Sequence, residues 1–191
     1  MKKVSYNKAV FLDRDGVINR EVGNIYRAAD LEILPRAGKA IKKLNAAGFK
    51  VIVVTNQSII AKAMATHKTL RTIHAKMIRH LKKDGATIDA VYYCPHHPKG
   101  SVKRYAIECD CRKPGIGMIK KAQKKFNLDL KKSFLVGDTT GDILTGKRAG
   151  VHTILVKTGH SGKDGKYKAV PHAIAKDLYE AVQYIVLMSH E

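Results

Sequence analysis

Residues 9–16 read Ala9-Val10-Phe11-Leu12-Asp13-Arg14-Asp15-Gly16, four apolar residues that lead into two carboxylates and a glycine. A short apolar run of this kind is typical of a strand buried in a parallel sheet. The strand would end at Asp13 and Asp15, whose side chains point the same way while the chain stays extended. Because ligands bind beyond the carboxyl ends of parallel strands, these carboxylates are candidates for a functional site. A solvated acidic turn is the alternative interpretation.

The composition is that of a globular protein. The chain has 191 residues, of which 45 % are hydrophobic, so we expect one domain over residues 1–191. No apolar run approaches the length of a membrane span. The basic start, residues 1–8, leads only into a short apolar strand, so we expect no signal peptide and a cytoplasmic protein.

The net charge is strongly positive, because 36 Lys and Arg face 16 Asp and Glu, giving +20. Such a charge speeds association with phosphorylated partners and permits salt-sensitive nucleic-acid binding. The lysines, however, are scattered over exposed helix positions. There is no Trp and aromatics make up 6 %, so a platform for stacking single-stranded bases is not expected. A basic nucleic-acid-binding protein therefore stays open only as an alternative.

Apolar runs and apolar faces alternate along the chain, which predicts strands and helices in turn. Further strands are predicted at residues 51–55, 90–93, 133–136 and 153–156. Helices are predicted at residues 36–47, 66–83, 117–126, 142–149 and 173–187. This alternation favours an α/β fold, a doubly wound parallel sheet with helices on both faces. A loop rich in Pro, His and Gly, at about residues 94–112, interrupts the pattern.

Three of the predicted helices carry a clear apolar stripe. In the helix over 36–47 it would consist of Ala37, Ala40, Ile41, Leu44 and Ala47. The stripe of the helix over 66–83 would consist of Leu70, Ile73, Met77, Ile78 and Leu81. In the last helix, Ile174 would share the buried face with Leu178, Ala181, Val182 and Ile185.

Polar residues follow several of the predicted strands. Thr55 and Asn56 end the second strand, Asp138 follows a later one, and Lys113 comes directly after the inserted loop. A nucleophilic carboxylate needs a second group to handle protons, and a hard divalent cation needs carboxylate oxygens. A phosphate needs hydroxyl or amide donors and a cationic side chain. Together these residues predict a site for phosphate chemistry.

The same residues resemble the four motifs of the haloacid dehalogenase superfamily of phosphatases. The motifs are Asp13-Arg14-Asp15-Gly16-Val17, Thr55-Asn56, Lys113 and Gly137-Asp138-Thr139-Thr140-Gly141-Asp142. The resemblance covers nearly the whole chain and implies a Rossmann-like sheet without a large cap domain. It also implies that Asp13 is the nucleophile, forming an aspartyl-phosphate, and that Asp15 is the general acid and base. Every principal position is filled, which favours an active enzyme over an inactive relative.

The resemblance assigns the remaining groups of the site as well. Thr55 would hold a phosphoryl oxygen, and Lys113 would neutralise charge on Asp13 and on the transferring group. Mg²⁺ would be held by Asp13, by Asp138 and by the backbone carbonyl of Asp15. Asp142 would either support this site or only start a helix. Substrate contacts would come from Asn56, Gln57 and Ser58.

The inserted loop carries a metal-ligand pattern. All three cysteines lie in Cys94-Pro95-His96 and Cys109-Asp110-Cys111, and an odd number of cysteines argues against a disulfide framework. Three thiolates and one imidazole form a closed tetrahedral Zn²⁺ site of the structural kind. Such a metal stabilises a loop that has no core of its own. Thiols without a metal are the alternative, and His97 competes with His96 as the ligand.

This loop resembles that of the zinc-containing heptose-bisphosphate phosphatases, in residues 94–98, 100–102 and 109–114. The resemblance favours His96 as the zinc ligand and implies that Arg112 contacts the substrate, at its distal C1 phosphate. It implies removal of the 7-phosphate of D-glycero-D-manno-heptose 1,7-bisphosphate, on the way to nucleotide-activated heptose for lipopolysaccharide. The partner would be this small sugar bisphosphate, and we expect a monomer that does not bind membranes.

The chain departs from the family pattern after Ser58. Ile59 stands where the family usually has Gly, and Lys62-Ala63 replaces Arg-Gly. Because Gly usually marks close approach or a positive φ, Ile59 could reshape this loop and narrow the pocket.

Three alternatives to the heptose enzyme remain. Histidinol-phosphate phosphatases carry a similar metal loop, but with a shorter gap between the ligand pairs. A nucleic-acid 3′-phosphatase would account for the charge. A zinc-stapled interaction module would hold zinc without any catalysis.

Overall fold

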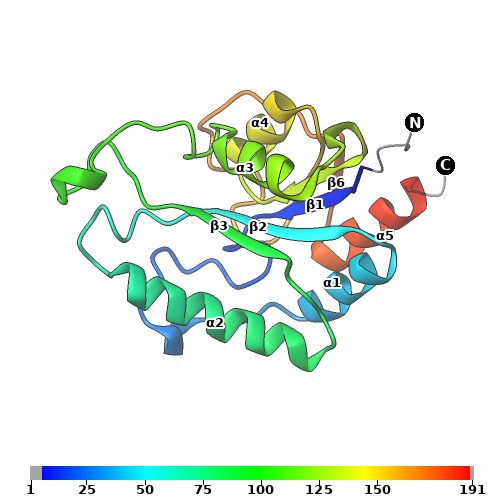
Figure 1. The fold of residues 1–191 in the computed structure, drawn as a ribbon, viewed down its shortest axis with the longest axis horizontal. Helices are drawn as coiled ribbons and strands as arrows, with labels where there is room; N and C mark the ends of the chain where they lie inside the picture. The colour runs from blue at the N-terminus through cyan, green and yellow to red at the C-terminus, as the bar shows by residue number, and fades with distance from the viewer. Residues whose placement is uncertain (1–5, 190–191) are drawn as a thin grey trace.

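Six parallel strands form one sheet in the computed structural model, which describes residues 6–189 (Figure 1). The strands are β1 (Ala9–Leu12), β2 (Lys50–Asn56), β3 (Ala90–Cys94), β4 (Phe134–Gly137), β5 (His152–Val156) and β6 (Ala173–Ala175). Their order across the sheet is β3-β2-β1-β4-β5-β6. The direction of winding therefore reverses between β1 and β4, which is where open parallel sheets bind their ligands. The basic start of the chain, residues 1–5, lies outside the described residues.

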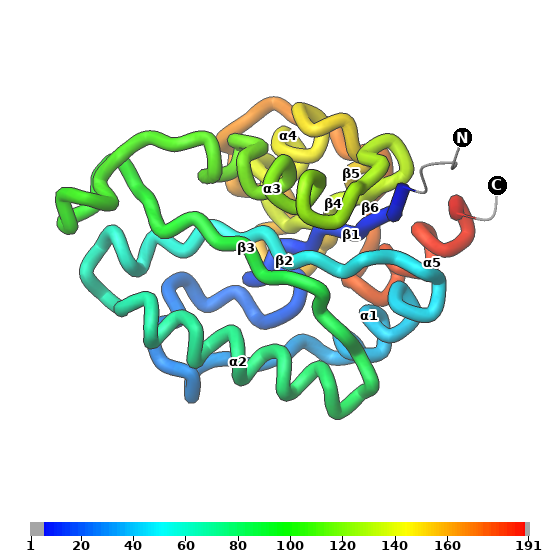
Figure 2. Tube along the Cα trace, in the orientation of Figure 1, coloured from blue at the N-terminus to red at the C-terminus, as the bar shows by residue number. Residues whose placement is uncertain are grey.

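Helices cover both faces of the sheet, as Figures 1 and 2 show. One face carries α1 (Ala37–Ala46), α2 (His67–Lys83) and α5 (Leu178–Met188), and the other carries α3 (Gly117–Phe126) and α4 (Thr140–Ala149). Short 3₁₀ turns are η1 (Ala28–Asp30), η2 (Lys103–Tyr105) and η3 (Leu130–Lys132). The predicted doubly wound α/β fold is confirmed. No helix within residues 6–189 has both the length and the apolar character needed to cross a membrane.

Two clusters form most of the core of the described residues, one on each face of the sheet. Val10 and Leu12 of β1 pack into the cluster formed with α1, α2 and α5, whereas Ala9 and Phe11 pack against α3. This split follows from the period of two in a strand. Burying a side chain of this size stabilises the fold by roughly 1.5–3 kcal/mol. The apolar run at residues 9–12 thus places Asp13 at the centre of the sheet.

The predicted apolar stripe of α2 needs one correction. Ile78 is 38 % exposed, and the buried position belongs to His74, which is 6 % exposed. His74 lies four residues after Leu70 and three before Met77, so helical geometry places these three on one face. Ile78 lies one residue further around the helix. The helical spacing already placed position 74 on the buried face, but a pattern of apolar residues does not include histidine.

The predicted last helix, residues 173–187, begins too early. Residues Ala173–Ala175 form the edge strand β6, in which Ile174 pairs with Leu155 and is 60 % exposed. Helix α5 begins after Asp177, whose carboxylate accepts a hydrogen bond from the Glu180 backbone N–H at 2.9 Å. An acidic residue three positions before a Glu is a known helix-start signature. That cap decides where the helix starts.

The two departures from the family pattern after Ser58 have different consequences. Ile59 is 2 % exposed and packs with Ile60 and Leu70. Its side chain therefore fills a small apolar cluster and does not line the cleft described below. Ala63 adopts a φ of 58°, a left-handed conformation that suits glycine better than alanine.

Candidate active site

The carboxyl ends of β1, β2 and β4 border a cleft of about 420 Å³. The backbone N–H of Asp13 still bonds to the Val136 carbonyl at 3.0 Å, so this residue is fixed by the sheet itself. The cleft contains most of the site residues that the sequence predicts. They are Asp13, Asp15, Thr55, Asn56, Ser58, Arg112, Lys113 and Asp138.

Lys113 lies between two carboxylates at the bottom of the cleft. Its Nζ is 2.8 Å from Asp13 Oδ1 and 2.5 Å from Asp142 Oδ1. Burial opposes a charge here, but the Asp13 and Asp142 carboxylates raise the pKa of Lys113 above its ordinary value. Asn56 fixes the backbone of Lys113, because its side-chain amide donates to the Lys113 carbonyl at 3.1 Å and accepts from the Lys113 N–H at 3.0 Å.

Three carboxylates converge around this lysine. Oxygens of Asp13, Asp138 and Asp142 all lie within 4.8 Å of one another. Burial, offset in part by Lys113 and reinforced by the neighbouring carboxylates, raises the pKa of Asp13 to about 7. Burial and the Asp13 carboxylate raise the pKa of Asp138 to about 8. Three buried carboxylates beside a single lysine leave negative charge that is not balanced. Their oxygens are the ligands that a hard divalent cation prefers.

Glycines enclose the Asp138 carboxylate. A Cβ at either Gly16 or Gly159 would overlap Asp138 Oδ2. The backbone N–H of His160 donates to the same oxygen at 2.7 Å. The backbone at these two glycines therefore holds the carboxylate in one orientation, and no residue with a Cβ fits at either position.

Asp15 forms the side wall of the cleft, and its side chain is 15 % exposed. Arg14 donates to it from Nε at 3.0 Å and from Nη2 at 2.7 and 2.8 Å. Asn19 and Gln57 each add a hydrogen bond of 2.9 Å. The orientation of this carboxylate is thus set by three side chains.

The structure divides the predicted substrate contacts. Asn56, Ser58 and Arg112 border the cleft, and Arg112 Nη1 donates to the His96 carbonyl at 3.0 Å. Gln57 is 3 % exposed and lies behind the wall, where its amide donates to Asp15 and to Thr55 Oγ1. This location suits a residue that orients Asp15 and Thr55, whereas the sequence predicted that Gln57 contacts the substrate.

The sequence interpretation missed a second wall of the cleft. After β5 the chain returns along residues 158–167, which supply His160, Asp164, Lys166 and Tyr167. Asp164 fastens this segment to α4 by accepting from the Thr140 N–H and Oγ1, both at 2.7 Å. Also missed were Glu21, Asn24, Lys62 and His97. One feature of the sequence could have indicated this wall: residues 158–167 follow the carboxyl end of a predicted strand, where ligands bind.

The three cysteines and His96 meet in the inserted loop. Sulfur–sulfur distances among Cys94, Cys109 and Cys111 are 3.2–3.5 Å, and His96 Nδ1 lies 3.7 Å from Cys94 Sγ and 3.5 Å from Cys111 Sγ. All three thiols are free. A tetrahedral site with Zn–S bonds of 2.3 Å has sulfur–sulfur edges of about 3.8 Å. The cluster is therefore close to the geometry of a structural zinc site.

His97 does not join this cluster. Among the described residues, the metal-type group in the loop consists of the three cysteines and His96. His97 instead accepts a hydrogen bond from the Lys99 N–H at 3.1 Å and borders the cleft. This placement agrees with the predicted choice of His96.

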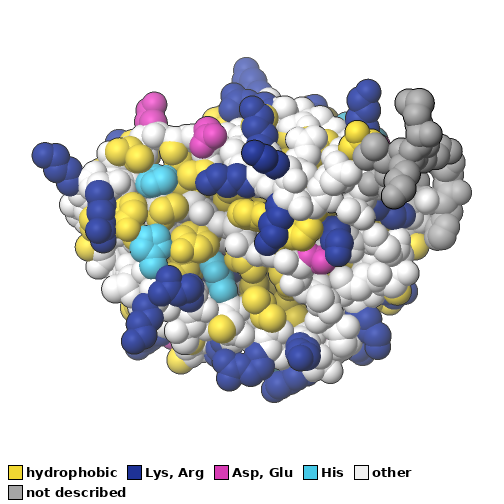
Figure 3. All heavy atoms as spheres, viewed as in Figure 1, with side chains coloured by type: hydrophobic (Ala, Val, Ile, Leu, Met, Phe, Trp, Pro, Cys, Tyr) yellow, Lys and Arg dark blue, Asp and Glu magenta, His cyan; other side chains and the backbone are white. Residues whose placement is uncertain are grey.

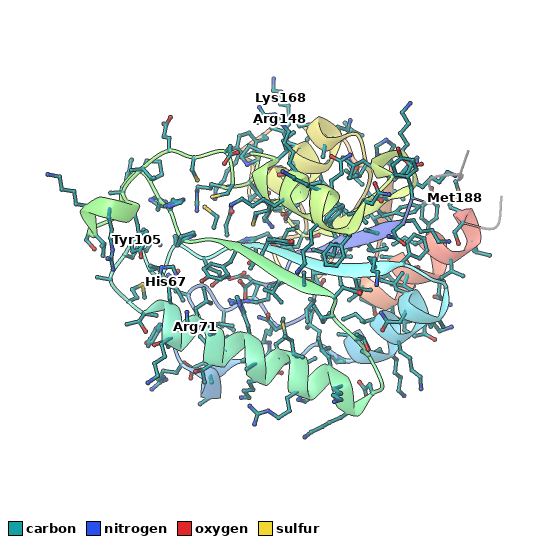
Figure 4. All side chains as sticks on the ribbon, viewed as in Figure 1. His67, Arg71, Tyr105, Arg148, Lys168 and Met188 are labelled. Carbon is teal, nitrogen blue, oxygen red and sulfur yellow. The ribbon has the colours of Figure 1, made fainter. Side chains whose placement is uncertain are left out.

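The imidazole of His67 connects the inserted loop to α2 and β3. His67, the first residue of α2, contacts Tyr93 OH through Nδ1 at 2.9 Å and Tyr105 OH through Nε2 at 2.8 Å. Figure 4 shows His67 and Tyr105 facing each other, with Arg71 one turn further along α2. Tyr105 also packs near His96, with ring centroids 6.1 Å apart. The loop is thus anchored at its tip as well as at its cysteines.

Comparison with known proteins places the chain in a family. The HAD-hydrolase-like family model matches residues 110–181. The D-glycero-alpha-D-manno-heptose-1,7-bisphosphate 7-phosphatase of Photorhabdus laumondii is 40 % identical over 85 % of this chain and 90 % of its own length. The beta-anomer enzyme of Haemophilus ducreyi is 39 % identical over 93 % and 98 %.

Solved structures agree. The D,D-heptose 1,7-bisphosphate phosphatase of B. bronchiseptica, complexed with magnesium and phosphate, superimposes with a TM-score of 0.84 at 32 % identity. The match covers 95 % of this chain and 99 % of that chain. The chain therefore belongs to the D-glycero-D-manno-heptose-1,7-bisphosphate 7-phosphatase family of haloacid dehalogenase-like hydrolases.

Proposed function

We propose that the protein is a Mg²⁺-dependent phosphatase that removes the 7-phosphate of D-glycero-D-manno-heptose 1,7-bisphosphate. One observation carries this proposal. The carboxylates of Asp13, Asp138 and Asp142 converge with Lys113 at the end of the central strand, inside an open cleft. This arrangement offers a nucleophile, a cation site and a fixed positive charge within one hydrogen-bonded group.

The first half of the reaction transfers the phosphoryl group to the protein. An oxygen of Asp13 attacks phosphorus, the bond from phosphorus to the sugar oxygen breaks, and Asp15 donates its proton to that leaving oxygen. Lys113 balances the negative charge that Asp13 and the phosphate bring together. Thr55, at the end of β2, donates its hydroxyl to a phosphoryl oxygen.

The second half returns the protein to its starting state. Asp15, now ionised, takes a proton from a water molecule that attacks the aspartyl-phosphate. The bond from phosphorus to Asp13 breaks, and inorganic phosphate leaves. Asp13 and Asp138, with Asp142 adjacent and the Asp15 carbonyl as a further oxygen, are the residues that would hold Mg²⁺. The metal supplies charge neutralisation for both halves.

The sugar bisphosphate is supported by the names of the relatives and by the cleft itself. Lys62, Arg112 and Lys166 border the cleft in addition to the buried Lys113. These cations complement a substrate that carries a second phosphate. The product would feed the synthesis of nucleotide-activated heptose.

Other parts of the proposal follow from the inserted loop and the sheet. Zn²⁺ bound by Cys94, His96, Cys109 and Cys111 would stabilise the insert at residues 94–112 within a single domain. Three free thiols in a metal-type cluster fit a reducing compartment, which supports a cytoplasmic location. A monomer remains our prediction.

Phosphate release from a substrate panel tests the function. The panel contains both anomers of the heptose bisphosphate, histidinol phosphate and a 3′-phosphorylated oligonucleotide, each with Mg²⁺ and with a chelator. We expect Mg²⁺-dependent turnover that is fastest with the heptose bisphosphate, and loss of about a thousandfold or more in Asp13→Asn, because the nucleophile is gone.

Asp13→Asn should retain its circular dichroism spectrum, which separates lost chemistry from lost structure. Faster turnover of histidinol phosphate or of the oligonucleotide would transfer the proposal to that substrate. Absence of turnover of every substrate with Mg²⁺ present would refute it.

A further inference from the structure

Arg14 has the largest side chain among the fully buried residues of the described chain, with 0 % exposed. A buried guanidinium is stable only where its donors are paired. Two of its nitrogens, Nε and Nη2, hold the Asp15 carboxylate in a forked contact at 2.7–3.0 Å. This contact alone leaves the third nitrogen, Nη1, without a partner.

His74 supplies that partner from α2. Its Nε2 lies 3.4 Å from Arg14 Nη1. Burial, together with the Arg14 charge, lowers the pKa of His74 to about 4, so the imidazole is neutral at neutral pH. A neutral ring can present an unprotonated Nε2 as an acceptor. His74 thus occupies a core position of α2 and meets the one nitrogen of Arg14 that Asp15 does not use.

The surroundings keep this histidine in place. The ring lies beside that of Tyr93 in β3, with centroids 5.7 Å apart and planes inclined at 58°. Its helical neighbours Leu70, Ile73 and Met77 are buried. The imidazole therefore has a fixed position from which to orient the guanidinium.

We infer that Arg14 and His74 form a positioning pair that sets the orientation of Asp15 for proton transfer to the leaving oxygen. The inference rests on the proposed function, in which Asp15 is the general acid. The chain of contacts runs from His74 through Arg14 to Asp15, and neither member of the pair has to touch the substrate. Without the acceptor at position 74, Arg14 keeps an unpaired buried donor and its fork can rotate away from Asp15.

The dependence of the rate on the leaving group separates positioning of an acid from general damage. A sugar alkoxide leaves only if it receives a proton, whereas p-nitrophenolate leaves without one. Loss of a positioned acid therefore slows phosphoryl transfer from the sugar phosphate, measured as kcat/KM, far more than transfer from p-nitrophenyl phosphate. Damage to the nucleophile, to the metal site or to the fold slows both substrates equally.

The experiment compares kcat/KM for heptose 1,7-bisphosphate and for p-nitrophenyl phosphate in four variants. This quantity reports the first phosphoryl transfer, whereas kcat also includes hydrolysis of the aspartyl-phosphate, in which Asp15 is the base for both substrates. His74→Leu removes the acceptor, whereas His74→Gln can place an amide oxygen near the position of Nε2. Arg14→Lys keeps a charge but loses the fork. His80→Leu, on the exposed side of the same helix, is the matched control.

We expect His74→Leu to lower kcat/KM for the bisphosphate by about tenfold and kcat/KM for p-nitrophenyl phosphate by less than about threefold. Arg14→Lys should show the same imbalance, more strongly. His74→Gln should recover most of the lost rate, and His80→Leu should match the wild type. Circular dichroism and melting curves establish that each variant is folded, and if Arg14→Lys does not fold, the two His74 variants carry the test.

Two outcomes would overturn the inference in different ways. Equal losses of kcat/KM for both substrates in His74→Leu, or no loss for either, would contradict the positioning role while the wild-type activity upholds the proposed function. A wild-type protein that hydrolyses neither substrate would remove the proposed function, and the inference with it.

Discussion

Asp142 has both of the roles that its sequence allowed. One oxygen accepts from the Thr139 N–H at 3.1 Å and from Thr139 Oγ1 at 2.5 Å, which closes a capping box at the start of α4. The other oxygen contacts Lys113 Nζ at 2.5 Å. The helix start and the site are therefore linked through one carboxylate, and a change at either affects both.

His74 should make the stability of the protein sensitive to acid. In the native state its pKa is lowered to about 4, first by burial and then by Arg14, with Asp15 acting in the opposite direction. In the unfolded state the ordinary value of about 6.5 returns, so the unfolded chain takes up a proton as the pH falls through 6.5. Stability from this group is present above 6.5 and is lost toward pH 4, by about 2 kcal/mol at pH 5.

Urea unfolding at pH 7 and pH 5 measures this effect as a difference between proteins. Asp13 and Asp138 have raised pKa values and contribute with the opposite sign, so the wild-type total mixes several groups. His74→Gln should lose about 2 kcal/mol less than the wild type between the two pH values. An identical pH dependence of the two proteins would show that His74 titrates normally.

Ala63 carries a backbone strain that glycine would relieve. It is exposed and has a φ of 58°. Ala63→Gly should therefore raise the free energy of unfolding by about 1 kcal/mol, because a left-handed conformation costs alanine about 1–2 kcal/mol and glycine's extra chain entropy offsets part of the gain.

The matched control is Ala75→Gly, at an exposed position inside α2. There the same replacement should lower stability by about 1 kcal/mol, since glycine is a poor helix former. Urea unfolding of both variants should give opposite signs. A loss of stability in Ala63→Gly would mean that this loop does not hold the left-handed conformation.

At the scale of elements, the inserted loop depends on its metal-type cluster. Residues 95–102 and 106–116 contain no helix or strand. The loop's contacts to the body include Cys109 with Cys94 of β3, Tyr105 with His67, and the Val102 N–H with the Ala61 carbonyl. Cys111 lies two residues before Lys113, so movement of the loop displaces the lysine of the site.

Removal of zinc should therefore affect both stability and activity. We expect one zinc per chain by elemental analysis, and Cys109→Ser should lose it and melt at least about 5 °C lower. Phosphatase activity should fall with the metal, because Lys113 is then held only by Asn56 and its two carboxylate partners, without the support of the neighbouring zinc ligand Cys111. His97→Gln is the control and should keep its zinc, since His97 lies outside the cluster. Full zinc in Cys109→Ser would contradict the assigned ligand set.

At the scale of the whole molecule, the net charge is strongly positive. Figure 3 shows Lys and Arg side chains dispersed over the visible face, without a single basic patch there. A net charge of +20 attracts anionic substrates from a distance, and this attraction is screened at ionic strengths near physiological. We therefore expect the charge to affect how often substrate arrives and not how fast it reacts.

Raising the salt concentration should separate these two quantities. Between about 20 and 200 mM salt, kcat/KM for the bisphosphate should fall severalfold while kcat stays constant. Steady-state kinetics at several salt concentrations measure both. Binding of a 3′-phosphorylated oligonucleotide should disappear over the same range, and tight binding at physiological salt would instead favour a nucleic-acid partner.

The local pattern of the sequence was enough to predict most of the fold. Apolar runs mark β1, β2 and β4, because strands buried on both faces leave little room for polar residues. Apolar runs also mark β3, a half-buried edge strand, and β5. The boundaries of α3 agree to the residue, while α5 starts five residues later than predicted. That error has a local cause, because the Asp177 cap outweighs the apolar periodicity.

The sequence by itself determined the fold class, the carboxylates at the strand ends and the cysteine pattern, because each depends on residues close together in the chain. Only the tertiary structure decided that Gln57 lies behind Asp15, that His74 meets Arg14 across 60 residues, and that residues 158–167 form a wall of the cleft. These contacts join segments distant in sequence, and the physical reason is that hydrogen bonding of buried polar groups depends on which elements the folded core brings together.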